Sequence, residues 1–269
     1  MRVKPIRVLQ FYGAHEINGL NQGNRNANDG IALAQTIEGG LDEISNMLQR
    51  IRTLAVQSAN GTLGDDDRDA IQGEADSLTA EISRIATQTT FGGKTILAGA
   101  GGDSIYATKA TMAGLDGNVT GAQLTLHVGA NTGNRIDMQV YNFQFSMLAL
   151  AAGLTKGTAA TSGFNNAGTG FNLDSQSGAN AAIAHIDNMI KVVDSQRADL
   201  GAIQNRLESS IRNQSNVSAN SADARSRIRD ADFAEESANL SQQSIIQQAA
   251  TSMLMQANTR PQLALSMLG

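Results

Sequence analysis

Residues 37–55 read IEGGLDEISNMLQRIRTLA, and the spacing of their apolar side chains decides the fold. These side chains recur in alternating steps of four and three residues, at Ile37, Leu41, Ile44, Leu48, Ile51 and Ala55. Such spacing places them along one stripe of an α-helix, close to the heptad repeat of packed helices. The sequence therefore predicts a helix from Asn28 to Ala55 with one buried face.

A second helix is expected directly after the first. The pair Asn60-Gly61 ends the first helix, and three consecutive aspartates, Asp65 to Asp67, suit the next helix start, where the dipole favours carboxylates. The second apolar stripe consists of Ile71, Ala75, Leu78, Ile82 and Ile85. Beyond it, Phe91-Gly92-Gly93-Lys94 predicts a turn, because a Gly-Gly pair is conformationally permissive.

The helical period returns after Ala179. The stripe here consists of Ile183, Ile186, Ile190, Val193, Leu200, Leu207 and Ile211, with polar interruptions at Arg197 and Gln204. A helix running to about Asn220 would span roughly 63 Å, too long to bury itself. Its partners must be the two N-terminal helices, so we expect the chain ends to lie together and the middle to project away. The expected packing residues are Ile37, Leu41, Ile44, Leu48 and Ile51, and opposite them Ile190, Val193, Leu200 and Leu207.

The middle of the chain, residues 99–178, has a different composition. It holds 14 of the 27 glycines, with many Thr, Ser and Asn residues. Residues 123–128 and 136–140 alternate with period two around a turn-rich segment, which predicts a β-hairpin. Residues 153–178 are expected to form a loop or a small exposed lobe. The overall prediction is a mainly α fold, an elongated rod-like bundle of long helices from both chain ends with a small Gly-rich β-hairpin and loop region between them.

The last segment, from Asp232 to Gly269, carries many apolar residues but contains no second helix that could cover them. Its large apolar residues include Phe233, Leu240, Ile245, Ile246, Met253 and Leu254. We expect a helix at least to Asn258, limited by Pro261. Because such a helix exposes apolar surface, it needs a partner helix, and Ile245, Ile246, Met253 and Leu254 are candidate residues of a terminal assembly helix.

The composition argues against several classes of function. The absence of cysteine excludes disulfides and thiolate chemistry, and a net charge of -5 without basic runs argues against nucleic acid. No apolar run is long enough to span a membrane, and no secretory signal is evident. His15, His127 and His185 are isolated, so no metal or cofactor is expected. No catalytic grouping is evident, so the chain is not expected to be an enzyme.

Several motifs resemble the conserved blocks of bacterial flagellins. Near the N-terminus they are NRNANDGI at 24–31, LQRIRTLAVQSAN at 48–60 and QTTFGGK at 88–94. Towards the C-terminus they are ADLGAIQNRL at 198–207, IRDADFA at 228–234, QQA at 247–249, QAN at 256–258 and PQ at 261–262. The order and spacing match over about residues 19–97 and 180–269.

The resemblance implies a filament subunit. Flagellins build a helical rod from both chain ends, carry a variable outer portion, and stack with other flagellin subunits into an extracellular flagellar filament. It also implies partners in the flagellar export apparatus, an export chaperone and a capping protein. The corresponding segments are 1–18, an atypical N-terminal segment; 19–98 and 179–230, the helical parts of the rod; 99–178, the variable region; and 231–269, the terminal helix. Residues 1–18 do not resemble the usual family start, so the C-terminal segment is expected to lack its usual partner within the chain.

Three alternatives stay open. Arg50, Leu54 and Glu74 match family positions that animal innate immune receptors contact; they also read as one face of the helix pair used in subunit packing, and both readings can hold. The chain could instead be a non-polymerising surface protein that binds a polysaccharide or acts as an adhesin through the middle segment. Aromatic surfaces for stacking on sugars are scarce in that segment, and the aromatic residues there are Tyr106, Tyr141, Phe143, Phe145, Phe164 and Phe171. A junction protein between hook and filament is a third reading.

Overall fold

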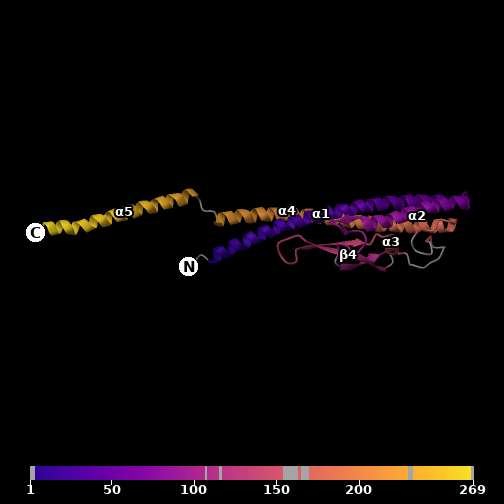
Figure 1. Cartoon of the computed structure of the whole chain (residues 1–269), viewed down its shortest axis with the longest axis horizontal. Coiled ribbons are helices and arrows are strands. Elements are labelled where there is room, and N and C mark those ends of the chain that lie inside the picture. Colours follow the sequence, from indigo (N-terminus) through magenta and orange to yellow (C-terminus); the bar gives the residue numbers. More distant parts are fainter. Residues whose placement is uncertain are drawn as a thin grey trace. The chain divides into compact units, whose positions relative to one another are not determined.

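The computed structural model describes residues 4–106, 108–114, 117–153, 163–164, 170–229 and 233–267. Long helices occupy both chain ends and a small antiparallel strand region lies between them in sequence (Figure 1). The chain divides into two compact units, of which the larger spans Asn18–Asn216. The smaller contains the described residues before and after that range, and each unit is described by itself below. The division into five segments stays a prediction.

Helix α1 (Lys4–Ser58) begins well before the start that the apolar stripe predicts. Its start includes Pro5, and a proline is tolerated in the first turn of a helix because no intrahelical partner is lost there. The predicted break at Asn60-Gly61 is confirmed. The buried side chain of Arg68 satisfies this end of α1, since its guanidinium donates to Ser58 O and Asn60 O, both at 3.1 Å.

Helix α2 (Asp65–Gln88) begins at the predicted aspartates. The backbone N–H of Gly64 donates to the carboxylate of Asp67 at 3.3 Å, which helps to fix the first turn. A tight two-stranded hairpin follows, β1 (Thr90–Phe91) and β2 (Lys94–Thr95). Gly92 and Gly93 connect these strands with φ of 58° and 79°, a region that glycine adopts without a steric penalty. The predicted Gly-Gly turn is therefore confirmed.

The predicted β-hairpin is confirmed as β4 (Gly117–His127) and β5 (Arg135–Tyr141). A further strand that the sequence did not predict, β3 (Thr108–Gly114), pairs with the other edge of β4, giving the order β3-β4-β5. In β5 the inward side chains alternate with exposed ones, and Ile136, Met138 and Val140 are buried. Helix α3 (Phe145–Ala151) follows the sheet.

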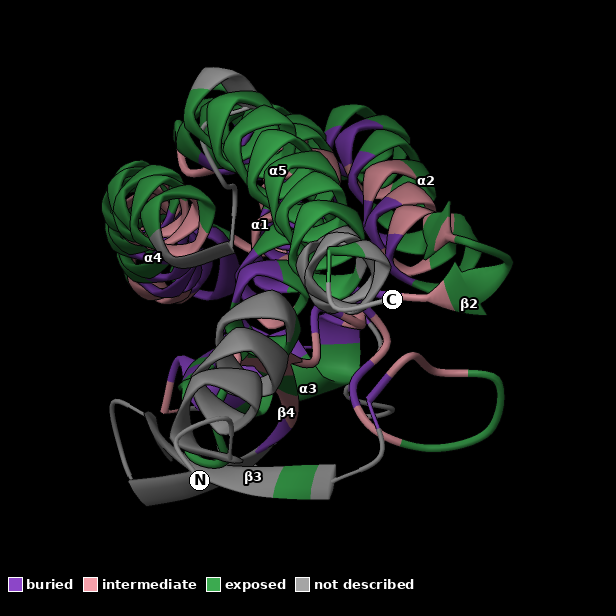
Figure 2. Ribbon diagram, turned by 90° about the vertical axis from the view of Figure 1, so that its left-hand side faces the viewer, coloured by how far each residue is buried: buried purple, intermediate pink, exposed green. Residues whose placement is uncertain are grey.

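The expectation that the middle projects away from the helices is wrong. Asn26 on α1 donates to His127 O of β4 at 2.8 Å, and a Cβ on Gly23 would lie 2.7 Å from Val128 O. Further along, Phe145 N donates to Ser83 Oγ on α2. The middle therefore packs along the helices of the larger unit (Figures 1 and 2), because its aromatic and apolar side chains need that surface for burial.

The C-terminal helices are longer than predicted. Helix α4 spans Gln176–Arg229 and helix α5 spans Phe233–Ser266. The prediction that Pro261 limits the last helix is wrong. A proline removes one backbone hydrogen bond, but the residues after it, Gln262 to Leu265, include good helix formers that continue the helix. Part of the predicted lobe, residues 154–162 and 165–169, lies outside the described residues.

Candidate assembly surface

The predicted helix-packing residues lie where α1, α2 and α4 meet in the larger unit. Every one of them except Ile190 is fully buried, namely Ile37, Leu41, Ile44, Leu48, Ile51, Val193, Leu200 and Leu207. Ile190 is only partly buried, and Met189 beside it is the fully buried side chain of that turn. Because these contacts are satisfied inside one chain, the residues stabilise the subunit and are not free to join subunits.

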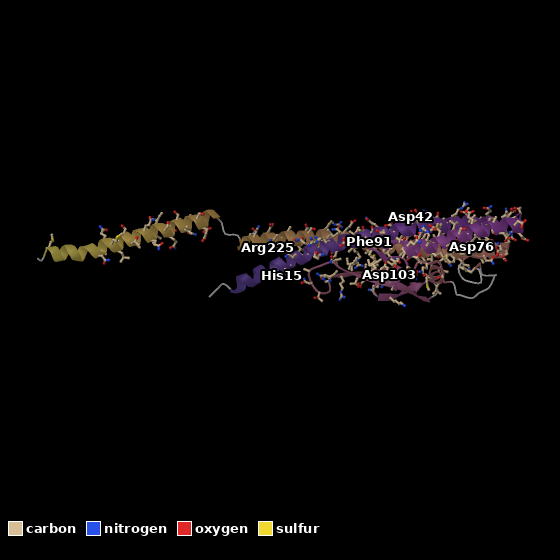
Figure 3. All side chains as sticks on the ribbon, viewed as in Figure 1. His15, Asp42, Asp76, Phe91, Asp103 and Arg225 are labelled. Carbon is tan, nitrogen blue, oxygen red and sulfur yellow. The ribbon has the colours of Figure 1, made fainter. Side chains whose placement is uncertain are left out.

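Ion pairs on the surface of the same bundle connect its helices. Arg50 on α1 pairs with Glu74 on α2 at 2.7 Å, and Arg197 on α4 pairs with Asp42 on α1 at 3.4 Å (Figure 3 labels Asp42). Of the three candidate receptor contacts, Arg50 and Glu74 are therefore exposed and paired with each other. Leu54 is buried, with 2% of its surface exposed. Recognition by an immune receptor stays a prediction.

The middle segment does not offer the aromatic platform proposed for a polysaccharide. Phe143, Phe145 and Phe171 are almost entirely buried, and Phe145 and Phe171 meet edge to face with centroids 5.1 Å apart. Tyr106 is also buried, and its hydroxyl donates to Ile96 O at 2.8 Å. Side chains in these positions form a core. Aromatic stacking surface in the middle is therefore scarce, as predicted, since of the six aromatic residues only Tyr141 is partly rather than fully buried.

Helix α5, in the smaller unit, has the opposite character. Every described side chain from Glu235 to Asn258 is exposed (Figure 2, green). The large apolar ones are between 54% and 71% exposed, and they are Leu240, Ile245, Ile246, Met253, Leu254 and Met255. So many exposed large apolar side chains on one helix are uncommon on a monomeric protein and typical of an interaction surface.

The absence of charged side chains over most of α5 indicates which kind of surface it can bind. From Ser237 to Asn258 it carries no charged residue, and its polar side chains are Ser, Thr, Asn and Gln. Ile246, Ala250, Met253 and Ala257 follow the steps of four, three and four that create one stripe on a helix. Leu240, Leu254 and Met255 lie on other faces, so apolar side chains surround the helix. A helix that is apolar on all sides and uncharged fits burial among other helices, with amide side chains able to hydrogen-bond beside them.

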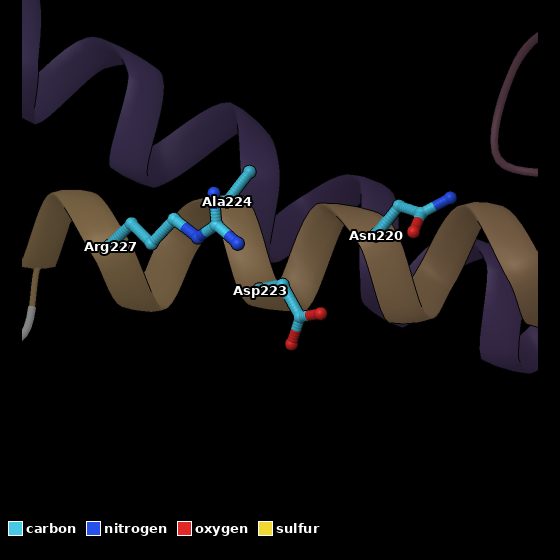
Figure 4. A pocket seen from close by; sticks show the side chains of 4 residues that line it. All are labelled: Asn220, Asp223, Ala224 and Arg227. Carbon is cyan, nitrogen blue, oxygen red and sulfur yellow. The ribbon is translucent and has the colours of Figure 1, made fainter.

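Other features of the described chain do not point to a chemical site. A surface hollow on α4 is lined by Asn220, Asp223, Ala224 and Arg227, all on one face of a single helix (Figure 4). No three His, Cys, Asp or Glu side chains of the described residues gather as metal ligands would. Among the same residues, none of the helices combines the length and apolar character that crossing a membrane requires.

The sequence analysis missed the buried polar residues of the larger unit, of which Gln196 is one. Gln196 on α4 is 0% exposed, although the polar interruptions of the stripe were assigned to Arg197 and Gln204. A signal for it exists in the spacing, because Gln196 follows Val193 by three residues and precedes Leu200 by four. Spacing of this kind places a side chain near the buried face, and Gln196 is fully buried there whereas Gln204, between Leu200 and Leu207, is only partly buried.

Comparisons with known proteins agree with the presence of long helical regions towards both ends of the chain. Residues 14–101 match the bacterial flagellin N-terminal helical region, and residues 183–268 match the bacterial flagellin C-terminal helical region. The chain is 39% identical over 254 residues to the flagellar filament 31.3 kDa core protein of Treponema maltophilum, covering 94% of this chain and 81% of that protein. It is 38% identical over 255 residues to a flagellin of Halalkalibacterium halodurans, covering 94% and 80% respectively.

Solved structures give the same picture of the fold. The crystal structure of Bacillus cereus flagellin is similar with a TM-score of 0.50 and 25% identity, covering 71% of this chain and 88% of that one. A flagellar hook-associated protein from Legionella pneumophila is similar with a TM-score of 0.54, covering 82% of this chain and 99% of that one. At 15% identity the latter supports the fold alone.

Proposed function

This chain belongs to the bacterial flagellin family, and from that premise we propose that α5 is the surface through which its copies join. The chain is a structural subunit of the bacterial flagellar filament, which is an extracellular assembly. The observation that supports α5 as the joining surface is the exposure of its uncharged apolar side chains. The buried stripes of α1 and α4 hold the subunit together, whereas α5 still has apolar surface to bury.

The energetics favour burial of α5 in an assembly. Removing a large aliphatic side chain from water contributes about 1.5–3 kcal/mol when it is fully buried. Ile245, Ile246 and Leu254 are all more than half exposed, so most of this contribution is still available. Because residues 237–258 carry no charge, no ionised group in this stretch has to be desolvated when the helix is covered.

The proposal includes the route of the chain to the filament. It is exported through the flagellar secretion channel, held before export by a chaperone and added to the filament under a capping protein. The absence of cysteine supports this route, because a chain without thiols cannot be cross-linked before it leaves the cell.

Seeded growth of filaments tests the role of α5. Fragments of intact flagellin filaments are mixed with the full chain, and growth is followed by sedimentation and electron microscopy. Wild-type protein should elongate the seeds. Ile246→Asp should remain in the supernatant, because it places a carboxylate in a surface that must lose its water.

A matched control uses another exposed apolar residue. Leu150 on α3 is 43% exposed, so Leu150→Asp makes the same chemical change outside α5. This variant should elongate the seeds as the wild type does. If Ile246→Asp elongates seeds at the wild-type rate, α5 is not the joining surface.

A further inference from the structure

The amide of Gln196 makes an unusual pair of contacts with the sheet. Its Nε2 donates to Gln139 O at 2.9 Å, and its Oε1 accepts from Tyr141 N at 3.1 Å. Gln139 and Tyr141 are alternate residues of β5, so their outward backbone groups lie on the same edge of that strand. One side chain therefore satisfies two consecutive outward groups of an edge strand.

These contacts reproduce the hydrogen bonds of a neighbouring strand. In a parallel ladder one residue accepts from the N–H of a residue on the facing strand and donates to the C=O two positions earlier. The amide of Gln196 likewise accepts from Tyr141 N and donates to Gln139 O, the residues on either side of Val140, but it does so from a helix. Since β5 is an outer strand of the order β3-β4-β5, the contact lies on an edge with which no described strand pairs.

We propose that Gln196 acts as a substitute strand residue that closes the β5 edge of the sheet. It commits β5 to α4 of its own chain and prevents this edge from pairing with a strand of a second copy. Unpaired strand edges are a common route to unwanted association. The inference rests on the proposed function in one respect: a subunit that must join copies through helices benefits from a closed sheet edge.

The surroundings explain why glutamine occupies this position. Val193 and Leu200, one turn to either side on α4, are fully buried, so residue 196 lies inside an apolar stripe. An aliphatic side chain there would keep the packing but would remove both hydrogen bonds to β5. Glutamine therefore combines burial of its stem in the apolar stripe with an amide that reaches the strand.

The same type of contact recurs at the other end of the hairpin. Asn26 on α1 donates to His127 O at 2.8 Å, and Gln214 on α4 donates to Val128 O. Side-chain amides from two helices therefore bind backbone carbonyls at both ends of the β4–β5 pair. Gln196 differs from the other two because it both donates to and accepts from the backbone of one strand, which is the pattern of a ladder residue.

Hydrogen exchange of the full-length chain tests the closure of the edge. In Gln196→Met, which keeps an unbranched side chain of similar length, the amide of Tyr141 should exchange about tenfold faster than in the wild type. The amides of Met138 and Val140, which alternate to the β4 side, should keep their rates within about twofold. A merely loosened unit would instead accelerate all three amides, and that result would overturn the proposal, as would an unchanged Tyr141 amide.

A glutamine two turns along the same helix provides the control. Gln204 donates to Glu38 Oε2 at 3.2 Å and makes no contact with the sheet among its recorded hydrogen bonds. Gln204→Met should leave the exchange of Tyr141 at the wild-type rate. An equal acceleration in Gln204→Met would show a general effect of replacing glutamine on α4 and would contradict the specific role of Gln196.

The second half of the proposal concerns association without seeds. Unseeded Gln196→Met should form sediment with added β-structure in its infrared amide band, whereas unseeded wild type and Gln204→Met should not. Sediment without added β-structure, or no sediment, would refute the pairing of β5 between copies. Failure of wild-type protein to elongate filament seeds would count against α5 as the joining surface, and the exchange rates of Tyr141 would be unaffected by it.

Discussion

Arg52 on α1 and Asp187 on α4 form an ion pair in which Nε and Oδ1 are 2.7 Å apart, and this pair marks the register of the two helices. Asp42 lies ten residues before Arg52, and its partner Arg197 lies ten residues after Asp187. Asn24, a further 18 residues back, donates to Ser215, a further 18 residues on. One antiparallel register therefore holds from Asn24 to Arg52.

Reversing the charges of the register pair should reveal its role. The hydrogen bond and the charge of Asp187 raise the pKa of the Arg52 guanidinium. Arg52→Asp alone should lower the melting temperature, because two carboxylates then face each other. Adding Asp187→Arg should recover most of the loss, and the four melting temperatures form a double-mutant cycle. No recovery in the double variant would mean that the pair does not contribute to the register.

Shortening a side chain in the buried stripe of α1 should lower the free energy of unfolding far more than shortening one on its surface. Leu48 is fully buried, so Leu48→Ala should lower the free energy of unfolding by about 2–5 kcal/mol. Val56 on the same helix is 50% exposed, and Val56→Ala should change it by less than about 1 kcal/mol. Urea denaturation followed by circular dichroism measures both. Equal losses for the two variants would contradict the packing described for α1.

Two glycines of α1 should respond in opposite directions to the same substitution. A Cβ on Gly23 would lie 2.7 Å from Val128 O, so Gly23→Ala should push the hairpin away and lower the melting temperature. A Cβ on Gly39 would meet no atom within 4 Å, so Gly39→Ala should stabilise the helix by about 0.5–1 kcal/mol. A stable Gly23→Ala variant would show that the hairpin does not need close contact with α1.

The sequence predicted the helices and strands that can be recognised from the spacing of their own apolar residues. The steps of four and three predicted α1, α2 and α4, and the alternation of residues 123–128 and 136–140 predicted β4 and β5. Strand β3 could not be predicted, because Thr108–Gly114 contains one large apolar residue, Met112, and forms a strand by pairing with β4. Helix α3 is too short to show a helical period.

The packing of the middle on the helices depends on contacts between distant residues. Gly23, Asn26 and Gln196 read in the sequence as ordinary helix residues, and only the folded chain brings them to the backbone of β4 and β5. The aromatic residues of the middle read equally well as a sugar-binding surface or as a core. For α5, the sequence indicated that a partner is needed, because a single helix cannot bury its own large apolar side chains.

Stability should depend on pH through Asp174. Burial raises the pKa of Asp174, and the nearby carboxylates of Asp69 and Asp76 raise it further. Because the folded chain binds this proton more tightly, the contribution of Asp174 to stability is full below the ordinary Asp value of about 3.9 and is lost as pH rises through the folded pKa. Asp174→Asn should therefore raise the melting temperature slightly at pH 7 and not at about pH 3.

Asp194 provides a matched position for that measurement. It is exposed on α4, and Asp194→Asn removes the same charge. We expect the melting-temperature difference from wild type to change with pH for Asp174→Asn and to change less for Asp194→Asn. Identical pH profiles for the two variants would show that the surroundings of Asp174 do not matter.

The measurement that tests the central claim most directly is the mobility of a spin label on α5. The chain contains no cysteine, so Met253→Cys introduces a single thiol for a nitroxide, at a side chain that is 69% exposed. The electron paramagnetic resonance spectrum is recorded before and after seeded growth, with Met147→Cys on α3, 38% exposed, labelled for comparison. Burial of α5 between subunits predicts a mobile label at residue 253 in the free chain and a strongly immobilised one in sedimented filaments. A label at residue 253 that stays as mobile in filaments as in the free chain would contradict the account.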